Sequence, residues 1–274
     1  MSIVHPGQAP NPVRRTLGRA LARAVDRVGP TALSALRELV LVALLFEFYR
    51  LGRLLARGEV ASARRHAEFV HRLEHALRLP SEADLQALVP SDAWLHAANV
   101  YYVSVHFPAM IAFLVWGYVF RPRWEYVWTR NLVAALTGAA LVVHIYYPLA
   151  PPRMFPQWGF VDTMAVLGPD AYAGASGDLA NQFAAMPSLH IGWAALIAYV
   201  VHRTGPKWLA WVATLHLTIT VFVVVVTANH YWMDGVVALV LLAAVSRVVR
   251  PKVPAEEESA QPATLALSHE PASR

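Results

Sequence analysis

Long apolar runs separated by short polar segments are the feature that most constrains the fold of this chain. Runs of this length satisfy their backbone polar groups in lipid only as helices. The 274 residues are 57% hydrophobic and 15% charged, whereas an average soluble domain is about 45–50% apolar and roughly 25% charged. These values exclude a disordered chain, a collagen and a disulfide-rich scaffold. We therefore predict an all-α integral membrane bundle.

Six transmembrane helices are predicted. The first apolar run is the weakest, because Arg37, Glu38 and Glu47 interrupt it, and an interfacial helix is the alternative. Several runs are shorter than the roughly 20 residues of a lone span, which fits helices packed against one another. The runs cover residues 33–51, 94–120, 132–147, 190–201, 208–227 and 233–249.

The polar segments divide the chain into three parts: a basic arm at 1–32, a six-span domain at 33–250 and a tail at 251–274. The arm carries five arginines and one acid before the first apolar run, which favours a cytoplasmic location. The tail is rich in Pro, Ala, Ser and Glu, which predicts disorder. Between the first two spans, residues 60–77 repeat apolar positions every three or four residues, which predicts an amphipathic helix.

Basic residues indicate which way the bundle crosses the membrane. Six spans place the arm, the loops 121–130 and 203–207, and the start of the tail on one side, which the positive-inside rule makes cytoplasmic. The loop 148–187 and the turn around Asn229 then face the other side. We predict a plasma-membrane protein whose active site faces the extracytoplasmic side.

The same composition limits the chemistry. The absence of cysteine excludes thiol redox catalysis, thiolate metal sites and disulfides. The net charge of +5 comes from basic residues beside the ends of apolar runs, so we predict the bilayer and no nucleic acid as partner. His71 and His75 have the spacing of metal ligands, but a solvated polar face is the preferred interpretation, and no metal or cofactor is expected.

Two short stretches carry the candidate chemistry, and each lies where an extracytoplasmic loop meets a span. In the stretch 185–190, Pro187 and Ser188 favour a helix start, which directs backbone N–H groups and the positive dipole end toward the loop. In the stretch 229–234, His230 and Asp234 are four residues apart on one helical face. The carboxylate can then fix one ring nitrogen as a donor and leave the other as a nucleophile or base.

Other histidines have a structural explanation. His106, His144 and His216 lie in apolar runs, where a histidine usually makes hydrogen bonds between helices. His190 and His230 differ because they lie at equivalent depths near span ends, and His230 has Asp234 beside it.

The stretches 185–190 and 229–234 resemble the second and third motifs of the type 2 phosphatidic acid phosphatase superfamily. Leu189 in place of a glycine, and the His-Tyr pair at His230, look more like the inositol phosphorylceramide synthase branch, whose members are inositolphosphotransferases. The stretches 99–102 and 106–108 look like bacterial members of that branch. The resemblance covers about residues 33–249.

The resemblance implies a metal-independent lipid phosphatase or phosphotransferase. In it His230 attacks phosphorus and forms a phosphohistidine, Asp234 orients His230, His190 protonates the leaving oxygen, and Arg153 and Ser188 hold the phosphoryl oxygens. The substrate would be a phospholipid or a polyprenyl phosphate.

Two positions depart from the family pattern, with Tyr146 at the place of a lysine and Val224 at the place of an arginine. Fewer cations favour a phosphodiester over a dianionic monoester, and hence transfer to an alcohol. The alternatives are a lipid phosphate monoesterase, an intramembrane serine protease using Ser188, which leaves Asp234 without a role, and a small transporter whose histidines relay protons.

Overall fold

The computed structural model describes residues 33–44, 47, 60–170 and 182–252, and the regular elements in these ranges are helices. The chain divides into two compact units, residues 1–48 and 49–274. In the first unit, residues 33–44 are helical, whereas the predicted arm at 1–32 lies outside the described residues. Most of the rest of the 33–51 run and of the predicted tail at 251–274 also lies outside them.

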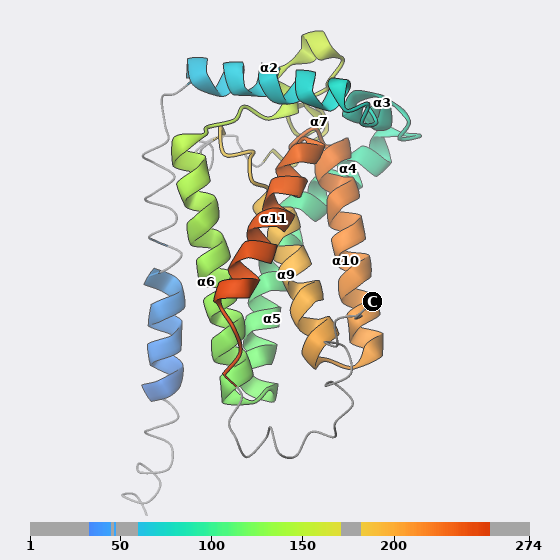
Figure 1. Cartoon of the computed structure of the whole chain (residues 1–274). Coiled ribbons are helices and arrows are strands. Elements are labelled where there is room, and N and C mark those ends of the chain that lie inside the picture. The colour runs from blue at the N-terminus through green and yellow to red at the C-terminus, as the bar shows by residue number, and fades with distance from the viewer. Residues whose placement is uncertain (1–32, 45–46, 48–59, 171–181, 253–274) are drawn as a thin grey trace, which may run out of the picture. The chain divides into compact units, whose positions relative to one another are not determined.

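The second unit contains the helices that carry the candidate site (Figure 1). One isolated parallel bridge, between Leu149 and Ala184, joins two parts of the segment that connects α6 to α9. The helices are α2 (Val60–Ala76), α3 (Glu82–Ala87), α4 (Asp92–Ser104), α5 (His106–Phe120), α6 (Arg123–Tyr146), α7 (Thr163–Leu167), α9 (Leu189–Thr204), α10 (Lys207–Val226) and α11 (Trp232–Val248), with short 3-10 turns η1 (Pro152–Met154) and η2 (Pro156–Trp158).

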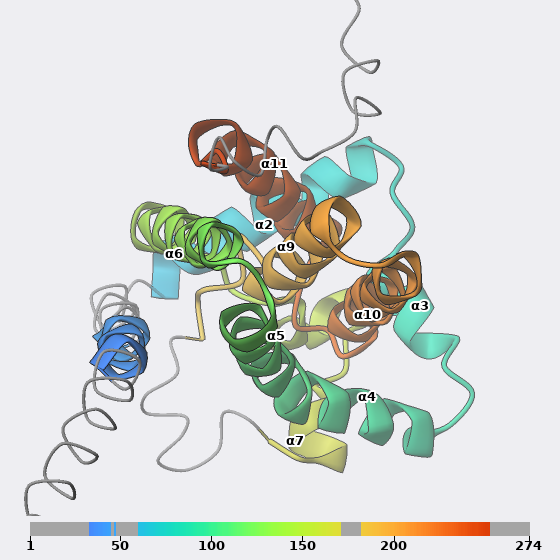
Figure 2. The ribbon, with the colours of Figure 1, turned by 90° about the horizontal axis from the view of Figure 1, so that it is seen from below.

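Helix α9 is the centre of the bundle. It packs against α5, α6, α10 and α11, which surround it when the bundle is seen along its length (Figure 2). Its sequence suits this place because apolar side chains occupy every face, and nearly all of α9 from Ile191 to Val201 is buried. A helix that is apolar all round belongs in the interior. His190, in its first turn, is therefore held by the most enclosed element of the fold.

Among the helices that the structure describes, two, α6 and α10, are long and apolar enough by themselves to cross a membrane. A third span is added if α4 and α5, which bend by 42° at their junction, count as one. The predicted run 94–120 is thus a broken helix, and α9 and α11 have 16 and 17 residues. The all-helical class is confirmed, while the number of six spans stays a prediction.

The predicted loop 121–130 is wrong for most of its length, because α6 begins at Arg123. Its first two turns are polar enough to escape a hydropathy reading, yet Arg121 pairs with Glu125 at 2.7 Å and Trp128 donates to the carbonyl of Val249. Arg121 also donates to the carbonyl of Thr204, so the turns 121–122 and 204–207 lie at the same end, as predicted.

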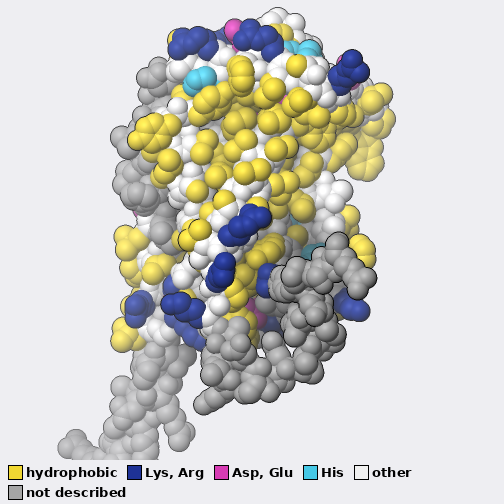
Figure 3. All heavy atoms as spheres, in the orientation of Figure 1, with side chains coloured by type: hydrophobic (Ala, Val, Ile, Leu, Met, Phe, Trp, Pro, Cys, Tyr) yellow, Lys and Arg dark blue, Asp and Glu magenta, His cyan; other side chains and the backbone are white. Residues whose placement is uncertain are grey.

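Helix α2 confirms the predicted amphipathic segment. It lies across the opposite end of the bundle (Figure 1) and buries Ala63, Ala67 and Val70. On the face shown in Figure 3, Lys and Arg side chains gather over α2, and hydrophobic side chains cover much of the surface below it. The apolar band beside a basic edge is the pattern of a protein that meets a bilayer surface.

Two buried amides hold the segment between α6 and α9 against the helices. Gln86 donates to the carbonyl of Val161 and accepts from its N–H, at 3.0 and 2.8 Å. Asn99 donates to the carbonyl of Thr163 and accepts from the Thr163 hydroxyl, at 2.9 and 2.8 Å. Because the nitrogen and the oxygen of each side-chain amide both have hydrogen-bond partners, the segment has a fixed path over the end of the bundle.

Candidate active site

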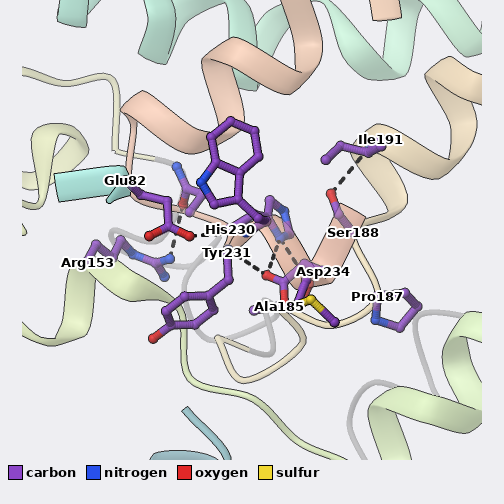
Figure 4. A network of polar contacts seen from close by, with 12 residues as sticks. Glu82, Arg153, Ala185, Pro187, Ser188, Ile191, His230, Tyr231 and Asp234 are labelled. Carbon is purple, nitrogen blue, oxygen red and sulfur yellow. Dashed lines mark hydrogen bonds and ion pairs between the residues drawn. The ribbon is translucent and has the colours of Figure 1, made fainter. Parts of the chain in front are cut away.

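The start of α9 is built as the sequence predicts. Ser188 is the N-cap, and its Oγ accepts a hydrogen bond from the N–H of Ile191 at 3.3 Å (Figure 4). The backbone N–H of Ser188 donates to the carbonyl of Asp234 at 3.1 Å, which joins α9 to α11. On the other side, Nε2 of His144 lies 3.2 Å from the carbonyl of Pro187, so α6 also holds this turn.

These contacts limit the hydrogen-bond donors that Ser188 can offer to an anion. Its N–H is already bonded to Asp234, and its Oγ accepts from Ile191. The hydroxyl hydrogen is the donor that these bonds leave over. The N–H groups of Leu189 and His190 belong to the first turn of α9 and have no carbonyl one turn earlier to bond within the helix. The role of Ser188 in holding phosphate stays a prediction.

His230 lies in the turn between α10 and α11, and it is buried together with Asp234. Nδ1 of His230 is 3.1 Å from Oδ2 of Asp234 and 2.9 Å from the carbonyl oxygen of Ala185. Both neighbours accept hydrogen bonds, so Nδ1 carries the proton and Nε2 keeps a lone pair. Within the described residues, Nε2 has no hydrogen-bond partner. The ring is therefore oriented as a nucleophile or base.

Burial keeps this ring neutral. It lowers the pKa of His230, the carbonyl of Ala185 opposes the shift, and the positive charge of Arg153 lowers the pKa further. A lowered pKa means that His230 remains uncharged, and so able to donate its lone pair, at pH values where an ordinary histidine is partly protonated.

Arg153 lies in η1, far from His230 in the sequence, and is held against the turn that precedes His230. The backbone N–H of Arg153 donates to the carbonyl of Ala228 at 2.9 Å, and its Nη1 donates to Oδ1 of Asn229 at 3.0 Å. Its Nε lies 3.6 Å from Oδ2 of Asp162. A buried guanidinium beside the His230 turn is a site for an anion, because it presents a planar fork of donors.

His190 completes the arrangement. Its ring centroid is 5.8 Å from that of His230 and 4.1 Å from that of Tyr102, on which it stacks. The separation from His230 lets both rings approach one small group placed between them. The structure thus brings together all five predicted residues: His190, His230, Asp234, Arg153 and Ser188.

The predicted departures from the family pattern have a structural counterpart. Tyr146, at the place of the usual lysine, is 82% exposed, and Val224, at the place of the usual arginine, is fully buried in an apolar cluster. Val224 contributes its backbone instead, since its carbonyl accepts from the N–H groups of Asn229 and His230 at 3.1 and 3.2 Å. Neither side chain supplies a cation.

The other histidines follow the structural explanation in two cases. Nδ1 of His216 in α10 lies 2.7 Å from the hydroxyl of Tyr101 in α4, which links two helices as predicted, and His144 links α6 to the turn before α9 through the Pro187 carbonyl. The prediction is wrong for His106, because neither of its ring nitrogens has a hydrogen-bond partner in the described residues. Its ring instead lies 4.3 Å from that of His190, centroid to centroid.

No group of three His, Asp or Glu side chains in the described residues is arranged to hold a metal ion. His71, one member of the pair with ligand spacing, stacks on Trp158 at a centroid distance of 4.2 Å. That contact fastens α2 to η2, which gives His71 a packing role.

Sequence reasoning missed three side chains that support the site. Asn229 was part of a recognised stretch, but nothing in its spacing indicated a bond to Arg153. Nothing in the sequence around Glu74 and Glu82 indicates a place beside the site, yet both are buried and accept hydrogen bonds from the start of α11.

Comparison with known proteins places this site in a family. A family model described as the PAP2 superfamily matches residues 68–248, a range that includes all five predicted site residues. No curated protein and no solved structure matches the chain.

Proposed function

This chain belongs to the PAP2 superfamily, and we propose that it transfers the phosphoryl group of a membrane lipid through a phosphohistidine. Membership of this superfamily supports a phosphatase-type enzyme that acts on phosphate esters. The observation that carries this proposal is the state of His230. Its Nδ1 is engaged by Asp234 and Ala185, while its buried Nε2 is without a hydrogen-bond partner in the described residues. The His190 ring lies 5.8 Å from the His230 ring, centroid to centroid, and the charge of Arg153 acts on His230.

The first step breaks the ester bond. Nε2 of His230 forms an N–P bond, and the bond from phosphorus to the lipid oxygen breaks. His190 gives its proton to the leaving oxygen, and Arg153 offsets the charge on the phosphoryl oxygens in the transition state. Asp234 stabilises the imidazolium that forms on His230 because its carboxylate already lies at Nδ1.

The second step releases the enzyme. An acceptor hydroxyl gives its proton to His190, its oxygen forms a bond to phosphorus, and the N–P bond breaks with the electron pair returning to His230. Water as acceptor gives hydrolysis, and an alcohol gives transfer. The same residues serve both outcomes, so the acceptor decides between them.

Two observations favour transfer of a phosphodiester-linked head group. Tyr146 is exposed and Val224 is buried among apolar side chains, so neither contributes a cation to offset a second negative charge on a monoester. By resemblance, the donor is an inositol-containing phospholipid. Hydrolysis of phosphatidic acid or of a polyprenyl phosphate is the second candidate, and the phosphatase-type family favours it.

A substrate panel tests the proposal. Purified protein is given phosphatidic acid, a polyprenyl phosphate or phosphatidylinositol, each with and without a lipid alcohol, while free phosphate and new lipid products are followed. We expect a product that depends on the alcohol, and none from the His230→Ala variant. Rapid phosphate release from a monoester, without an alcohol-dependent product, would establish the phosphatase instead. Absence of any turnover by the wild type would favour the transporter.

A further inference from the structure

Two buried glutamates, one on α2 and one on α3 (the outer helices), accept hydrogen bonds from the first turn of α11, the helix whose Asp234 orients His230. Oε1 of Glu82, at the start of α3, accepts from the N–H of Trp232 at 3.2 Å. Oε1 of Glu74, near the end of α2, accepts from the N–H of Met233 at 2.8 Å. Asp234 itself accepts from the N–H of Tyr231 through Oδ2 at 3.0 Å. Three carboxyl groups therefore occupy three consecutive N–H groups.

These N–H groups are the ones that a helix leaves without internal partners, and α11 begins at Trp232. Carboxyl oxygens stabilise such a start through hydrogen bonds and through the positive end of the helix dipole. The unusual feature is that two of the three come from helices about 150 residues earlier in the chain. A cap of this kind fixes α11 to the outer helices, not only to its own turn.

The outer helix is also fixed to the segment that carries Arg153. Nδ1 of His66 lies 2.7 Å from the carbonyl of Pro148, and the His66 ring stacks on Tyr147 at 3.9 Å. The carbonyl of Ala63 accepts from the N–H of Ala150 at 3.2 Å. Helix α2 thus contacts both segments whose side chains meet at the site, which are the Arg153 segment and the start of α11.

The two glutamates at this cap are not both charged at neutral pH. Burial raises the pKa of Glu74 to about 9, the neighbouring Glu82 carboxyl adds to the rise, and the Met233 N–H opposes it. Glu74 therefore keeps its proton at neutral pH, and the pair carries at most one negative charge. The other titratable groups that interact with the pair are Tyr231 and Asp234 at the start of α11 and His71 on α2.

We propose that Glu74 and Glu82 are positioning residues, which fix the first turn of α11 so that Asp234 stays at Nδ1 of His230, with Glu74 in its neutral form. The proposal rests on the proposed function for its catalytic consequence. A neutral Glu74 keeps its hydrogen bond to Met233 without adding a second negative charge near Asp234. Doubly ionised glutamates would repel each other and Asp234 in a buried site.

Substitutions separate this role from simple packing. Glu74→Gln preserves the acceptor oxygen and mimics the protonated acid, so it should keep kcat near the wild-type value. Glu74→Ala and Glu82→Ala remove the acceptors, and a displaced His230–Asp234 pair should lower kcat by about 100-fold with little change in KM. Glu68→Ala is the matched control, because Glu68 lies on the exposed side of α2. Each kcat is expressed per folded protein.

Two measurements do not depend on turnover. Hydrogen exchange over residues 229–236 should be slow in the wild type and in Glu74→Gln, and faster in Glu74→Ala and Glu82→Ala. Thermal stability of the wild type should fall as pH rises from 4.5 to about 9, because over this range the folded state holds a Glu74 proton that the unfolded state has already lost. Glu74→Gln should flatten this dependence.

The outcomes distinguish the two proposals. If the wild type turned over none of the lipids, the proposed function would fall, while exchange and pH-dependent stability would still decide whether the pair fixes α11 with a neutral Glu74. If Glu74→Gln lost activity as completely as Glu74→Ala, the proton would have no role. Wild-type kcat and exchange in both alanine variants would overturn the positioning of α11.

Discussion

Nη1 of Arg153 donates a hydrogen bond to Oδ1 of Asn229, in the turn before His230, at 3.0 Å. Asn229 is itself fixed, since its Nδ2 donates to the Thr227 hydroxyl at 2.8 Å. The guanidinium that is proposed to hold the phosphoryl group is therefore oriented by the residue adjacent to the proposed nucleophile. In the proposed mechanism, this turn would couple binding of the anion by Arg153 to attack by His230.

Replacing Asn229 with alanine should release Arg153 and lower kcat/KM. A hydrogen bond to a charged group contributes about 1.5–3 kcal/mol, which corresponds to roughly 10- to 100-fold in rate. Asn131→Ala is the control, because Asn131 also accepts from an arginine, Arg130, but on the exposed surface. Steady-state kinetics compare the two variants, and equal kcat/KM values would show that Asn229 does not position Arg153.

The proposed nucleophile and its partners should respond differently to substitution. His230→Ala and His190→Ala should each abolish turnover, whereas Asp234→Asn should reduce it less completely because an amide oxygen can still accept from Nδ1. Denatured wild-type protein quenched during turnover should carry an acid-labile phosphoryl group, which His230→Ala lacks. His202→Ala, a histidine at the other end of α9, is the control. Full activity in His230→Ala would exclude the phosphohistidine route.

The pH dependence follows from the burial of His230. Its pKa is lowered, so the ring should stay neutral below pH 6.5, where an unperturbed histidine begins to take up a proton. The decrease in kcat/KM that protonation of His230 causes should then occur below pH 6.5. A profile measured with a lipid substrate between pH 4 and 8 checks this, and an acid limb at or above 6.5 from His230 would contradict the burial argument.

The contact between α9 and α11 sets a further test at Gly235, which follows Asp234. A Cβ at Gly235 would lie 2.8 Å from Cδ1 of Ile191. Because that atom ends a flexible side chain, Gly235→Ala should cost little, whereas Gly235→Leu should separate the helices and displace Asp234 from His230. Activity and thermal unfolding of the two variants provide the comparison, with Gly138→Leu as control because no atom lies near a Cβ there. Activity retained in Gly235→Leu would show that the helices need not be this close.

Local patterns in the sequence predicted the parts of the site that are local in the chain. The spacing of His230 and Asp234 and the helix start at Ser188 depend on backbone geometry within one turn, so the sequence alone indicates them. Arg153 lies 76 residues from Asn229, and only a resemblance to a family connected it with the site. Glu74 and Met233 are 159 residues apart, and no pattern in either segment indicates the other.

Helix ends and breaks were harder to predict than helix existence, for a related reason. Hydropathy detects the part of a helix that faces lipid, so it missed the polar first turns of α6, which are stabilised by the Arg121–Glu125 pair. It also could not detect the bend at Val105, because α4 and α5 together are apolar enough to be taken for one span. Tyr102 in α4 and His106 in α5 both have their rings against that of His190, and these contacts form only when the chain folds.

The orientation of the site can be tested without knowing the substrate. The site, α2 and η2 lie at one end of the bundle, and the turn 204–207 lies at the other. Single cysteines at Gln157 in η2 and at Lys207 at the start of α10 have no background, because the chain contains no cysteine. Both positions are exposed, so a membrane-impermeant thiol reagent can reach each of them. Added to intact cells, the reagent should label Gln157→Cys and should label Lys207→Cys only after the membrane is permeabilised. The reverse pattern would place the site on the cytoplasmic side and restrict its lipid to the inner leaflet.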